Sequence, residues 1–495
     1  MSRSHFYAGR LFPLILLLAL IFTTIASAQV SLVQLSQDTF TNSSSQHQSE
    51  VEPGAYSYGS TIVTAFQVAR IYDGGGADIG FATSSDGGLT WTNGFLPGLT
   101  IYDGNGQSSA ASDAAVAYDA LHSVWLISVL PIGNNTSVAV SRSFDGINWS
   151  NPVSVTNQGS PDKNWIACDN TPTSKFYGHC YSEWDDTEQG DLIEMSTSTD
   201  GGITWSPEKA TAGRDYGIGG VPVVKPNGMV IVPIDGFNGD VIAFTSANGG
   251  KSWSKAVNVA SDDEAYEGGD LRSGGLVSSA IDAKGKVYVA WSDCRFRTDC
   301  SSNDIVYTTS SSGKKWTAVQ RVPIDAVTTT VDHFITGLAI DPATSGKKAH
   351  LALAYYYYPV ANCDSSTCQL YAGFIQSSTA GKTWSAPVTP AGPMKVTWLP
   401  NTFSGYMVAD YISVGFANGK AFPIVAVAQA NSGSTLHEAI YTTSTGQEPS
   451  REEEEFLTAE GDTPVPNAHS ARGPREFLDQ EDRIPVSGQH PPEKK

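Results

Sequence analysis

One octapeptide recurs along the chain and limits the folds that the sequence can adopt. The pattern S-x-D-G-G-x-T-W occurs at Ser84–Trp91 and at Ser198–Trp205. Four variants follow: Ser143–Trp149 is one residue shorter, Ser246–Trp253 has Asn248 in place of the acid, and Ser310–Trp316 and Ser378–Trp384 are shorter and lack the acid. The Asp suits a tight turn because its carboxylate can accept hydrogen bonds from nearby backbone amides, and the glycines accept positive φ. Six copies indicate a repeat array.

Runs that favour β-strands precede each copy of the octapeptide. Thr61–Ala69, Asp78–Thr83 and Val124–Leu130 are examples. They are short, rich in β-branched or aromatic residues, and separated by Gly, Asn and Asp turns. Helical periodicity is nearly absent. Four short antiparallel strands per repeat predict an all-β fold, the β-propeller.

The spacing of the repeats predicts the number of blades. Six blades end at an octapeptide: Glu50–Trp91, Asp113–Trp149, Asn164–Trp205, Gly219–Trp253, Leu276–Trp316 and Thr336–Trp384. A seventh has strands at Val408–Phe416, Ala421–Ala428 and Glu438–Ser444, and we expect Val30–Ser36 to add its fourth strand and close the ring. The prediction is a seven-bladed propeller of four-stranded antiparallel blades over residues 29–447. A six-bladed propeller is the alternative if the first blade is incomplete.

Both ends of the chain differ from the repeats. Residues 1–28 combine a basic start, the apolar run Leu11–Ile25 and the small residues Ala26-Ser27-Ala28, which is typical of a secretory signal peptide. A membrane anchor is the alternative. No second apolar run is long enough to span a bilayer, so we expect the mature protein to be secreted or periplasmic. Residues 448–495 are rich in acids and proline and poor in large apolar residues, which predicts a disordered acidic tail.

Six cysteines fall in three close pairs along the chain. The pairs are Cys168 with Cys180, Cys294 with Cys300, and Cys363 with Cys368. Six cysteines allow fifteen pairings, but closeness in sequence favours these three disulfides in an oxidising compartment. A metal site is the rival interpretation, and the spacings are not those of a zinc site. The net charge of −20 argues against nucleic acid as a partner, because phosphates require a basic face.

The predicted topology separates two faces of the propeller. The octapeptides are turns between third and fourth strands, on what we call the box face. The connections between second and third strands, and between successive blades, lie on the opposite side, the loop face. We expect function on the loop face near the axis, where the first strands converge. Polar residues stand near the starts of these strands: Glu52, Asp113, Asp162, Lys163, Asp215, Arg272, Asp332, His333 and Asp410.

The octapeptides resemble the Asp boxes, or BNR repeats, of the sialidase superfamily, and the similarity extends over Glu50–Ser444. A sialidase of that family holds the substrate carboxylate with three arginines and uses a Tyr nucleophile, a supporting Glu and an Asp acid/base. The resemblance implies Arg70, Arg272 and Arg295 as candidates for the arginines. It implies Asp73 or Asp78 as the acid/base, Glu267 as the glutamate, and Tyr406 or Tyr411 as the tyrosine.

The match to the family is partial. The Arg-Ile-Pro tripeptide that the family carries should lie around Glu50–Gly54 and is missing there. The only such tripeptide, Arg483-Ile484-Pro485, lies in the predicted tail. Sialidases also have six blades rather than seven. The resemblance therefore indicates the fold class more strongly than the activity.

The polar residues also have an interpretation that is independent of the family. Asp113, Asp332 and His333 would join the three arginines in a funnel suited to acid/base hydrolysis of a sugar or to binding alone. The alternative is that these residues cap turns and pair with one another. Asp185, Asp186 and Asp191 could together hold Ca²⁺, although their spacing matches no known calcium loop and a solvated acidic loop is the alternative. We expect no other cofactor and no other metal.

The sequence thus predicts an exported propeller whose partner is an extracellular carbohydrate or glycoprotein. One hypothesis is an exo-acting glycoside hydrolase of the sialidase type. The other is a non-catalytic propeller that binds a glycan or a protein at the same funnel. The sequence indicates no oligomeric state.

Overall fold

The computed structural model describes residues 1, 30–133, 136–448, 457–459 and 461–465. Nearly all of the predicted signal peptide, and most of the predicted acidic tail, lie outside these residues. The described part of the chain is built from β-strands and four short 3₁₀ helices, which confirms the all-β class. The helices are η1 (Thr187–Gln189), η2 (Thr298–Cys300), η3 (Gly346–Lys348) and η4 (Val396–Trp398). No helix among the described residues is long and apolar enough to cross a membrane.

Strands β2 to β9 form an eight-stranded sheet, which consists of two groups of four antiparallel strands. A single bridge, Gly76 to Ala111, joins the two groups. The first group is β2 (Glu50–Tyr58), β3 (Thr61–Arg70), β4 (Gly76–Ser84) and β5 (Thr92–Phe95). The second group is β6 (Ala110–Asp119), β7 (Val124–Ile132), β8 (Val138–Ser143) and β9 (Val153–Thr156).

Four further sheets each contain four antiparallel strands in sequence order. The third group is β10 (Pro161–Cys168), β11 (Cys180–Asp186), β12 (Leu192–Ser198) and β13 (Lys209–Ala210). The fourth is β14 (Val223–Val224), β15 (Val230–Gly236), β16 (Asp240–Ser246) and β17 (Val257–Ser261). The fifth is β18 (Ser278–Ile281), β19 (Val287–Asp293), β20 (Asp304–Ser310) and β21 (Gln320–Arg321). The sixth is β22 (Asp332–Ile340), β23 (Leu351–Tyr358), β24 (Gln369–Ser377) and β25 (Val388–Lys395).

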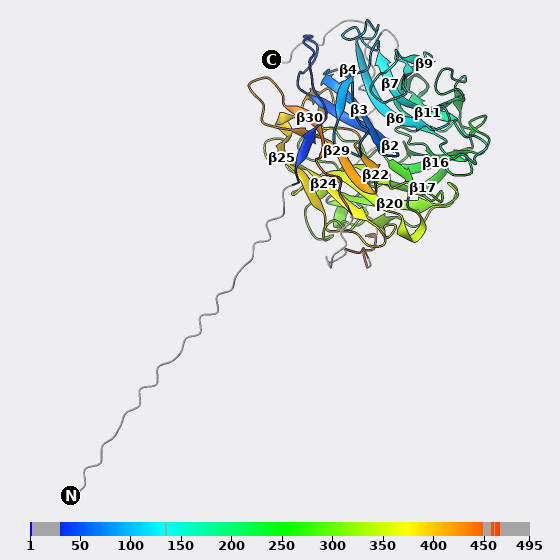
Figure 1. The fold of residues 1–495 in the computed structure, drawn as a ribbon. Helices are drawn as coiled ribbons and strands as arrows, with labels where there is room; N and C mark the ends of the chain where they lie inside the picture. The colour runs from blue at the N-terminus through cyan, green and yellow to red at the C-terminus, as the bar shows by residue number, and fades with distance from the viewer. Residues whose placement is uncertain (2–29, 134–135, 449–456, 460, 466–495) are drawn as a thin grey trace.

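The last sheet combines the two ends of the body. After a small hairpin of β26 (Asn401–Thr402) and β27 (Gly405–Tyr406), the chain forms β28 (Ser413–Ala417), β29 (Lys420–Ala428) and β30 (Glu438–Thr443). The fourth strand is β1 (Leu32–Gln34), which pairs antiparallel with β30. Figure 1 shows the blue start of the chain beside orange β30. The predicted use of Val30–Ser36 as the closing strand is confirmed.

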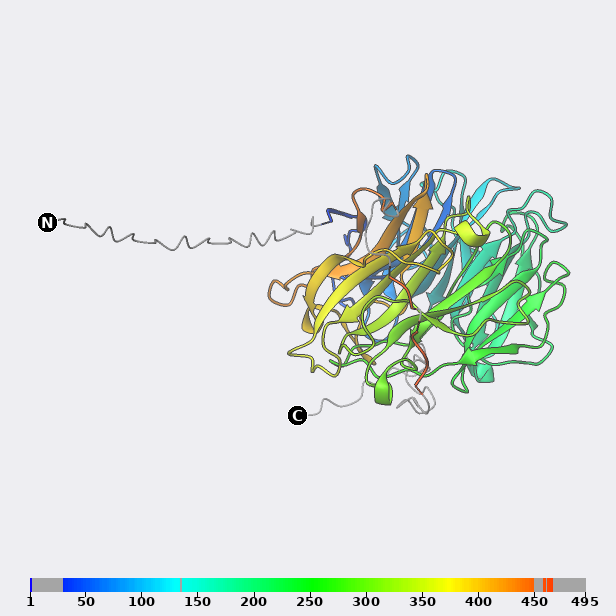
Figure 2. The ribbon, with the colours of Figure 1, turned by 90° about the horizontal axis from the view of Figure 1, so that it is seen from below.

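The first strands of the groups contact one another in sequence order, from β2 through β6, β10, β14, β18 and β22 to β28, and β28 in turn contacts β2. The groups therefore follow one another around a common axis, as the blue-to-orange progression in Figure 2 shows. Buried apolar clusters lie between neighbouring groups. One of them contains Val63 and Ile79 of the first group together with Val116 and Ile127 of the second.

The octapeptides form the turns that their sequence predicts. At Ser198–Trp205 one carboxylate oxygen of Asp200 accepts hydrogen bonds from the backbone N–H groups of Ile203 (3.1 Å) and Thr204 (2.9 Å) and from the hydroxyl of Ser198 (2.9 Å). The other accepts one from the hydroxyl of Thr204 (2.6 Å). The Asp200 carboxylate therefore supplies the hydrogen-bond acceptor that these backbone N–H groups would otherwise lack in the turn.

Three disulfides pair the cysteines as the spacing predicts. Cys294 is bonded to Cys300 in the connection between β19 and β20. Cys363 is bonded to Cys368 in the connection between β23 and β24. Both connections join a second strand to a third, so these two disulfides lie on the loop face. The metal-site interpretation of the cysteines is wrong, because all six sulfurs are in disulfides.

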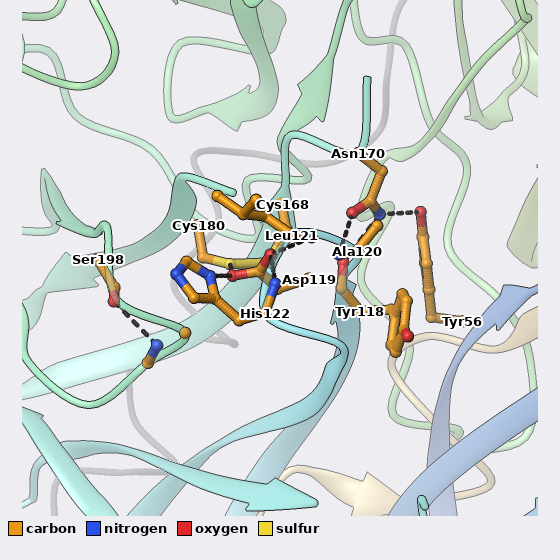
Figure 3. The surroundings of a disulfide bond; sticks show 12 residues. Tyr56, Tyr118, Asp119, Ala120, Leu121, His122, Cys168, Asn170, Cys180 and Ser198 are labelled. Atoms are coloured by element: carbon orange, nitrogen blue, oxygen red, sulfur yellow. Dashed lines mark hydrogen bonds and ion pairs between the residues drawn. A yellow bond between two sulfur atoms is a disulfide. The ribbon is translucent and has the colours of Figure 1, made fainter. Parts of the chain in front are cut away.

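The remaining disulfide belongs to the third group, where Cys168 and Cys180 face each other across β10 and β11. Figure 3 shows the surroundings of this bond, where Asn170 follows the first cysteine. The Asn170 side chain accepts from the backbone N–H of Ala120 (2.8 Å) and donates to the carbonyl of Tyr118 (2.8 Å). It also donates to the hydroxyl of Tyr56 (3.3 Å). The bridged hairpin is thereby fixed to the two groups before it.

Part of the predicted acidic tail contacts the body of the protein. Leu457 forms an antiparallel bridge with Trp384, with N···O distances of 2.9 and 3.0 Å. Further along, Asp462 lies 3.3 Å from a guanidinium nitrogen of Arg321, and the N–H of Val465 donates to the carbonyl of Arg295. These residues follow the outside of the fifth and sixth groups. The other residues of the predicted disordered tail lie outside the described part of the chain.

The turn at Ser198–Trp205 yields a stability prediction. Replacing Asp200 by Ala removes the acceptor of four hydrogen bonds, so we expect the free energy of unfolding to fall by about 1–2 kcal/mol. Asp200→Asn is the matched control, because Asn248 stands in the equivalent turn and its Oδ1 accepts from the N–H of Ser252 (3.1 Å). Denaturant titration of both variants measures the difference. Equal loss in the two variants would show that charge, rather than the acceptor, stabilises the turn.

Candidate functional site

Four of the first strands share the same irregularity near the loop face. A β-bulge interrupts the pairing of β2, β6, β10 and β22 with their second strands. At each bulge one residue other than glycine has positive φ: Glu52 at 57°, Asp113 at 49°, Lys163 at 46° and Ile335 at 47°. Such conformations cost on the order of 1–3 kcal/mol each and cluster at functional sites. The repetition marks this level of the axis as a candidate site.

Three of these bulge residues come together around the ammonium group of Lys163, which also binds Asp410, just before β28. The Nζ atom of Lys163 lies 2.5 Å from Asp410 Oδ2, 3.6 Å from Asp113 Oδ1 and 3.7 Å from Glu52 Oε1. A guanidinium nitrogen of Arg272 also lies 2.5 Å from Asp410 Oδ2. We call Glu52, Asp113, Lys163, Arg272 and Asp410 the axial cluster. Each member is at most 5% exposed.

The axial cluster holds its two central carboxyls in opposite protonation states. Burial raises the pKa of Glu52 to about 8, against the opposing attraction of Lys163. Burial also acts on Asp410, but the positive charges of Arg272 and Lys163 outweigh it and hold the pKa of Asp410 well below its usual range. Both carboxyls face the same ammonium group, that of Lys163. The environment therefore assigns a proton to Glu52 and a negative charge to Asp410 near neutral pH.

Of the three predicted arginines, Arg272 belongs to the axial cluster, and Arg70 lies next to it on the other side of Met407. The Nε of Arg70 is 3.1 Å from the sulfur of Met407, and a terminal nitrogen of Arg272 is 3.8 Å from the same sulfur. Arg295 binds elsewhere. Its guanidinium forms two hydrogen bonds with Asp293, of 2.7 and 2.5 Å, in the loop closed by Cys294 and Cys300.

The remaining candidates are dispersed. Asp73 is exposed in the turn between β3 and β4, and Asp78 is buried on β4. Glu267 accepts hydrogen bonds from the hydroxyl of Ser273 (2.5 Å) and the amide of Asn303 (3.1 Å). The backbone carbonyl of Tyr406 accepts from the N–H of Arg272 (2.7 Å). The predicted tyrosine–glutamate unit of Tyr406 and Glu267 stays a prediction.

Asp332 and His333 belong to a neighbouring buried region at the start of β22. Asp332 Oδ1 accepts from the backbone N–H of Asn303 (2.7 Å), and His333 Nδ1 lies 3.2 Å from the carbonyl of the same residue. Burial, with repulsion from Glu267 second, raises the pKa of Asp332 well above its usual value. Burial lowers the pKa of His333, so its imidazole is neutral near pH 7.

The described residues offer one group of three side chains with metal-ligand spacing: Asp304, Asp325 and His333. Arginines already occupy its carboxylates, because Arg297 lies 2.5 Å from Asp304 and 2.8 Å from Asp325. Asp185, Asp186 and Asp191 form no such group. Asp186 instead caps η1 and accepts hydrogen bonds from Ser160 and Gln189. Calcium binding at these three aspartates stays an untested prediction.

Two cavities are relevant to binding. The first, of about 250 Å³, follows the axis between the first strands of all seven groups, and Lys163 and Tyr411 line it at the level of the axial cluster. The second, of about 590 Å³, lies on the loop face between the third and fourth groups. Its lining includes Arg214, Tyr216, Phe237, Asn238, Asp240 and Asn258.

Sequence reasoning identified the residues at the starts of the first strands, which include every member of the axial cluster. It missed Gln67 and Met407, which complete the surroundings. The amide of Gln67 donates to Glu52 and to the hydroxyl of Ser112 (2.9 Å). Both residues lie in strands or connections with no distinguishing motif, so the sequence carries no signal for them.

Comparison with known proteins gives only distant similarities. A scan against models of protein families finds no match, and a search of curated proteins finds none. Similar solved structures include the NanB sialidase from Streptococcus pneumoniae, at 14% identity over 83% of this chain and 70% of that chain, with a TM-score of 0.41. The intramolecular trans-sialidase from Ruminococcus gnavus matches at 14% identity over 79% and 92%, with a TM-score of 0.40. A polysaccharide lyase of family PL25, an ulvan lyase, matches at 10% identity over 88% and 100%, with a TM-score of 0.47. At these scores the similarities do not establish an activity for this chain.

The burial of Asp78 yields a prediction for the pH dependence of stability. Burial raises the pKa of Asp78 to about 8, although Ile79 N–H and the Thr100 hydroxyl donate to its oxygens. The folded protein thus binds this proton more tightly than the unfolded chain does. The stabilisation is complete below about pH 4, near the carboxyl's ordinary pKa, and is lost as the pH rises through about 8.

We expect Asp78→Asn to flatten the decline of unfolding free energy between pH 5 and 8, by at most about 1.4 kcal/mol per pH unit. Denaturant titrations across this range measure the slope. Asp73→Asn, at the exposed position in the adjacent turn, is the control and should leave the slope unchanged. Parallel curves for wild type and Asp78→Asn would show that Asp78 is ionised in the folded protein.

Proposed function

We propose that the protein is an exported, seven-bladed β-propeller that binds extracellular glycans on its loop face. The cyclic contacts of the seven first strands and the closing strand β1 support the blade number. The three disulfides and the predicted signal peptide support export. The resemblance of the octapeptides to Asp boxes fits this architecture.

The observation that carries the proposal is the loop-face pocket of about 590 Å³. This size lies within the range typical of small-ligand sites. Tyr216, which is 47% exposed, lines this pocket, and so does Phe237 in the turn between β15 and β16. Sugar rings present flat C–H faces, which pack on aromatic side chains, and hydroxyl edges, which require planar polar partners.

The polar lining of the pocket supplies such partners. The amide of Asn258 donates to Asp240 Oδ2 (3.2 Å), and Arg214 donates to the side chain of Gln189 (3.3 Å). Asn238 is exposed at the tip of the turn. These amide, carboxylate and guanidinium groups can donate to and accept from hydroxyls at the same time, which suits a carbohydrate better than a purely apolar ligand.

Further exposed aromatic residues lie in connections of the same face. Tyr72 is in the turn after β3, Tyr266 precedes β18, and Phe403 is in the hairpin of β26 and β27. The N–H of Phe403 donates to the carbonyl of Tyr72 (3.3 Å), so these two come from distant segments to one place. We infer that a glycan longer than one unit can contact the face at more than one point.

The aromatic contacts can be tested by substitution. We expect Tyr216→Ala and Phe237→Ala each to weaken glycan binding at least tenfold, because truncation of an aromatic anchor typically costs more than 1 kcal/mol. A glycan array with the mature protein identifies a ligand, and calorimetry with that ligand measures the affinities. Phe144→Ala is the matched control, since Phe144 is 74% exposed on the box face. Loss of affinity in Phe144→Ala alone would move the site to the box face.

Exo-acting glycoside hydrolysis is the second candidate function, and the protonated state of Glu52 beside Arg70 and Arg272 favours it. A carboxyl that keeps its proton near pH 7 can act as a general acid. Asp410 is already paired with Lys163 and Arg272, each at 2.5 Å, so it is held in the axial cluster and is not available as a second catalytic carboxyl. Asp73, exposed on the loop face, is therefore the better candidate for the second carboxyl.

Chromogenic sialosides and neutral glycosides test this second function. If hydrolysis occurs at the axis, Glu52→Gln and Asp73→Asn should each lower kcat at least a hundredfold. Asp78→Asn is a control, because its hydrogen bonds to Ile79 and Thr100 place it within the sheet. Turnover that survives both substitutions would exclude the axial site, and absence of turnover on every substrate leaves glycan binding as the function.

A further inference from the structure

The six octapeptide turns of the box face differ systematically at one position, two residues before the Trp. In the first three groups this position is aliphatic: Leu89, Ile147 and Ile203. In the fourth, fifth and sixth groups it is a lysine: Lys251, Lys314 and Lys382. The face is therefore divided into two halves that differ in chemistry.

The acid of the turn is absent from the same three groups that carry the lysine. Asn248, Ser312 and Thr379 take its place in the turn. These residues still accept from the backbone, as when Thr379 Oγ1 accepts from the N–H of Thr383 (2.8 Å). Each of the first three turns thus carries one acid and no base, and each of the other three carries lysine and no acid.

The turns between first and second strands add lysines on the same side, because they lie at the same end of each antiparallel sheet as the octapeptides. In the fifth group Val287, after one such turn, pairs with Ser310 at the start of the octapeptide. Between the fifth and sixth groups, the N–H of Ala283 donates to the carbonyl of Thr344 (3.1 Å). The turns of these two groups form one continuous surface, the basic arc, whose lysines are Lys284, Lys314, Lys315, Lys347, Lys348 and Lys382.

The lysines of the basic arc are exposed, and none of them has an acidic partner among the described residues. The two carboxylates in these turns, Asp282 and Asp341, are 2% and 7% exposed. Asp282 accepts from the backbone N–H of Lys284 (2.9 Å), and Asp341 accepts from that of Ala343 (2.9 Å). The arc thus presents positive charge to solvent on a chain whose net charge is −20, which favours an anionic partner at this face.

The other half of the box face presents apolar side chains from the equivalent turns. Leu89 and Ile203 are 73% and 53% exposed, and Phe144 of the second octapeptide is 74% exposed. Leu121, in the turn between β6 and β7, is 50% exposed. A soluble anion would engage the lysines alone. A membrane surface can engage both halves, because its phosphate groups attract lysines and its interfacial region accepts apolar side chains.

We propose that the box face docks on a membrane that contains anionic phospholipids. The basic arc binds the phosphate head groups, while Leu89, Phe144 and Ile203 enter the interfacial region beside it. The loop face then points away from the membrane. Docking is separate from the candidate glycan pocket and does not depend on glycan binding.

Co-sedimentation of the full mature protein with vesicles of phosphatidylcholine, with and without phosphatidylglycerol, tests the proposal. We expect binding only where phosphatidylglycerol is present, and weaker binding as the salt concentration rises. Lys314→Gln/Lys315→Gln/Lys382→Gln should lower the affinity about a hundredfold, at about fivefold for each lysine. Equal binding to neutral and anionic vesicles would overturn the proposal.

A matched pair of single variants controls for net charge. Lys382→Gln should weaken vesicle binding about fivefold. Lys395→Gln makes the same change at an exposed position at the end of β25, on the loop face, and should leave the affinity unchanged. Equal losses in the two variants would show that the charge of the whole chain, rather than the basic arc, determines binding.

Leu89→Ser/Phe144→Ser/Ile203→Ser separates a membrane from a soluble polyanion, with dextran sulfate as the probe. This variant alters no charge, so we expect vesicle binding to weaken at least tenfold and dextran sulfate binding to stay the same. Unchanged vesicle binding in this variant, with dextran sulfate bound through the lysines, would assign the basic arc to a soluble polyanion and overturn the proposal. Thermal unfolding checks that each variant is folded, and the comparison of vesicles with wild-type protein stands by itself if one is not.

Discussion

The pairing of β1 with β30 is the interaction on which the rest of the structure depends. Residues separated by about 400 positions meet there, with Leu32 opposite Thr443 and Gln34 opposite Tyr441. Side chains strengthen the junction: the hydroxyl of Ser36 donates to Glu50 (2.7 Å) and accepts from the backbone N–H of Ile440 (2.8 Å). The first and last groups also pack against each other through β2 and β28, and the β1–β30 pairing adds backbone hydrogen bonds to that closure. The axial cluster exists only while that ring is closed, because its members come from the first, second, third and last groups and from the connection before β18.

The bulges explain why charged residues can gather at the axis without unfolding it. In a regular strand, alternate side chains point to opposite faces, and one inserted residue reverses that alternation. Glu52, Asp113 and Lys163 each occupy such an inserted position with positive φ. The cost of that conformation is offset by the attraction between Lys163 and the carboxylates around it. Removing one partner would leave the others buried and uncompensated, which in proteins costs about 3–5 kcal/mol. The network is therefore conformationally specific as well as charged.

The sequence was informative where short-range rules apply and silent where they do not. The octapeptide turns, the strand runs and the three disulfides follow from local spacing, and the closing strand follows from a last repeat that lacks its fourth strand. The structure confirms these features. The convergence of Glu52, Asp113, Lys163, Arg272 and Asp410 follows from topology once each is placed at the start of a first strand. The ion pairs within that set could not be predicted from the sequence. A β-bulge changes the direction in which a side chain points, and no sequence motif marks the bulges. Arg295 was expected at the axis because it lies in a loop of the loop face. Its guanidinium instead binds Asp293, two residues earlier in the chain, an interaction that the sequence did not indicate.

The buried axial cluster also determines how the two sides of the ring can act. Because its members are at most 5% exposed and pair with one another, a ligand on the loop face meets a closed polar floor rather than an open channel. The axial cavity begins on the other side of the same floor, where Lys163 is among the residues that line it. A change in the charge of the cluster alters the electrostatic potential on both sides of this floor, because Lys163 takes part in the ion pairs and also lines the cavity. Glu52 is the member best suited to such a change, because burial brings its pKa to about 8, close to neutral pH. Its deprotonation would add a second negative charge next to the ammonium group of Lys163, 3.7 Å from Glu52, and would leave the cluster with three carboxylates for its two cations.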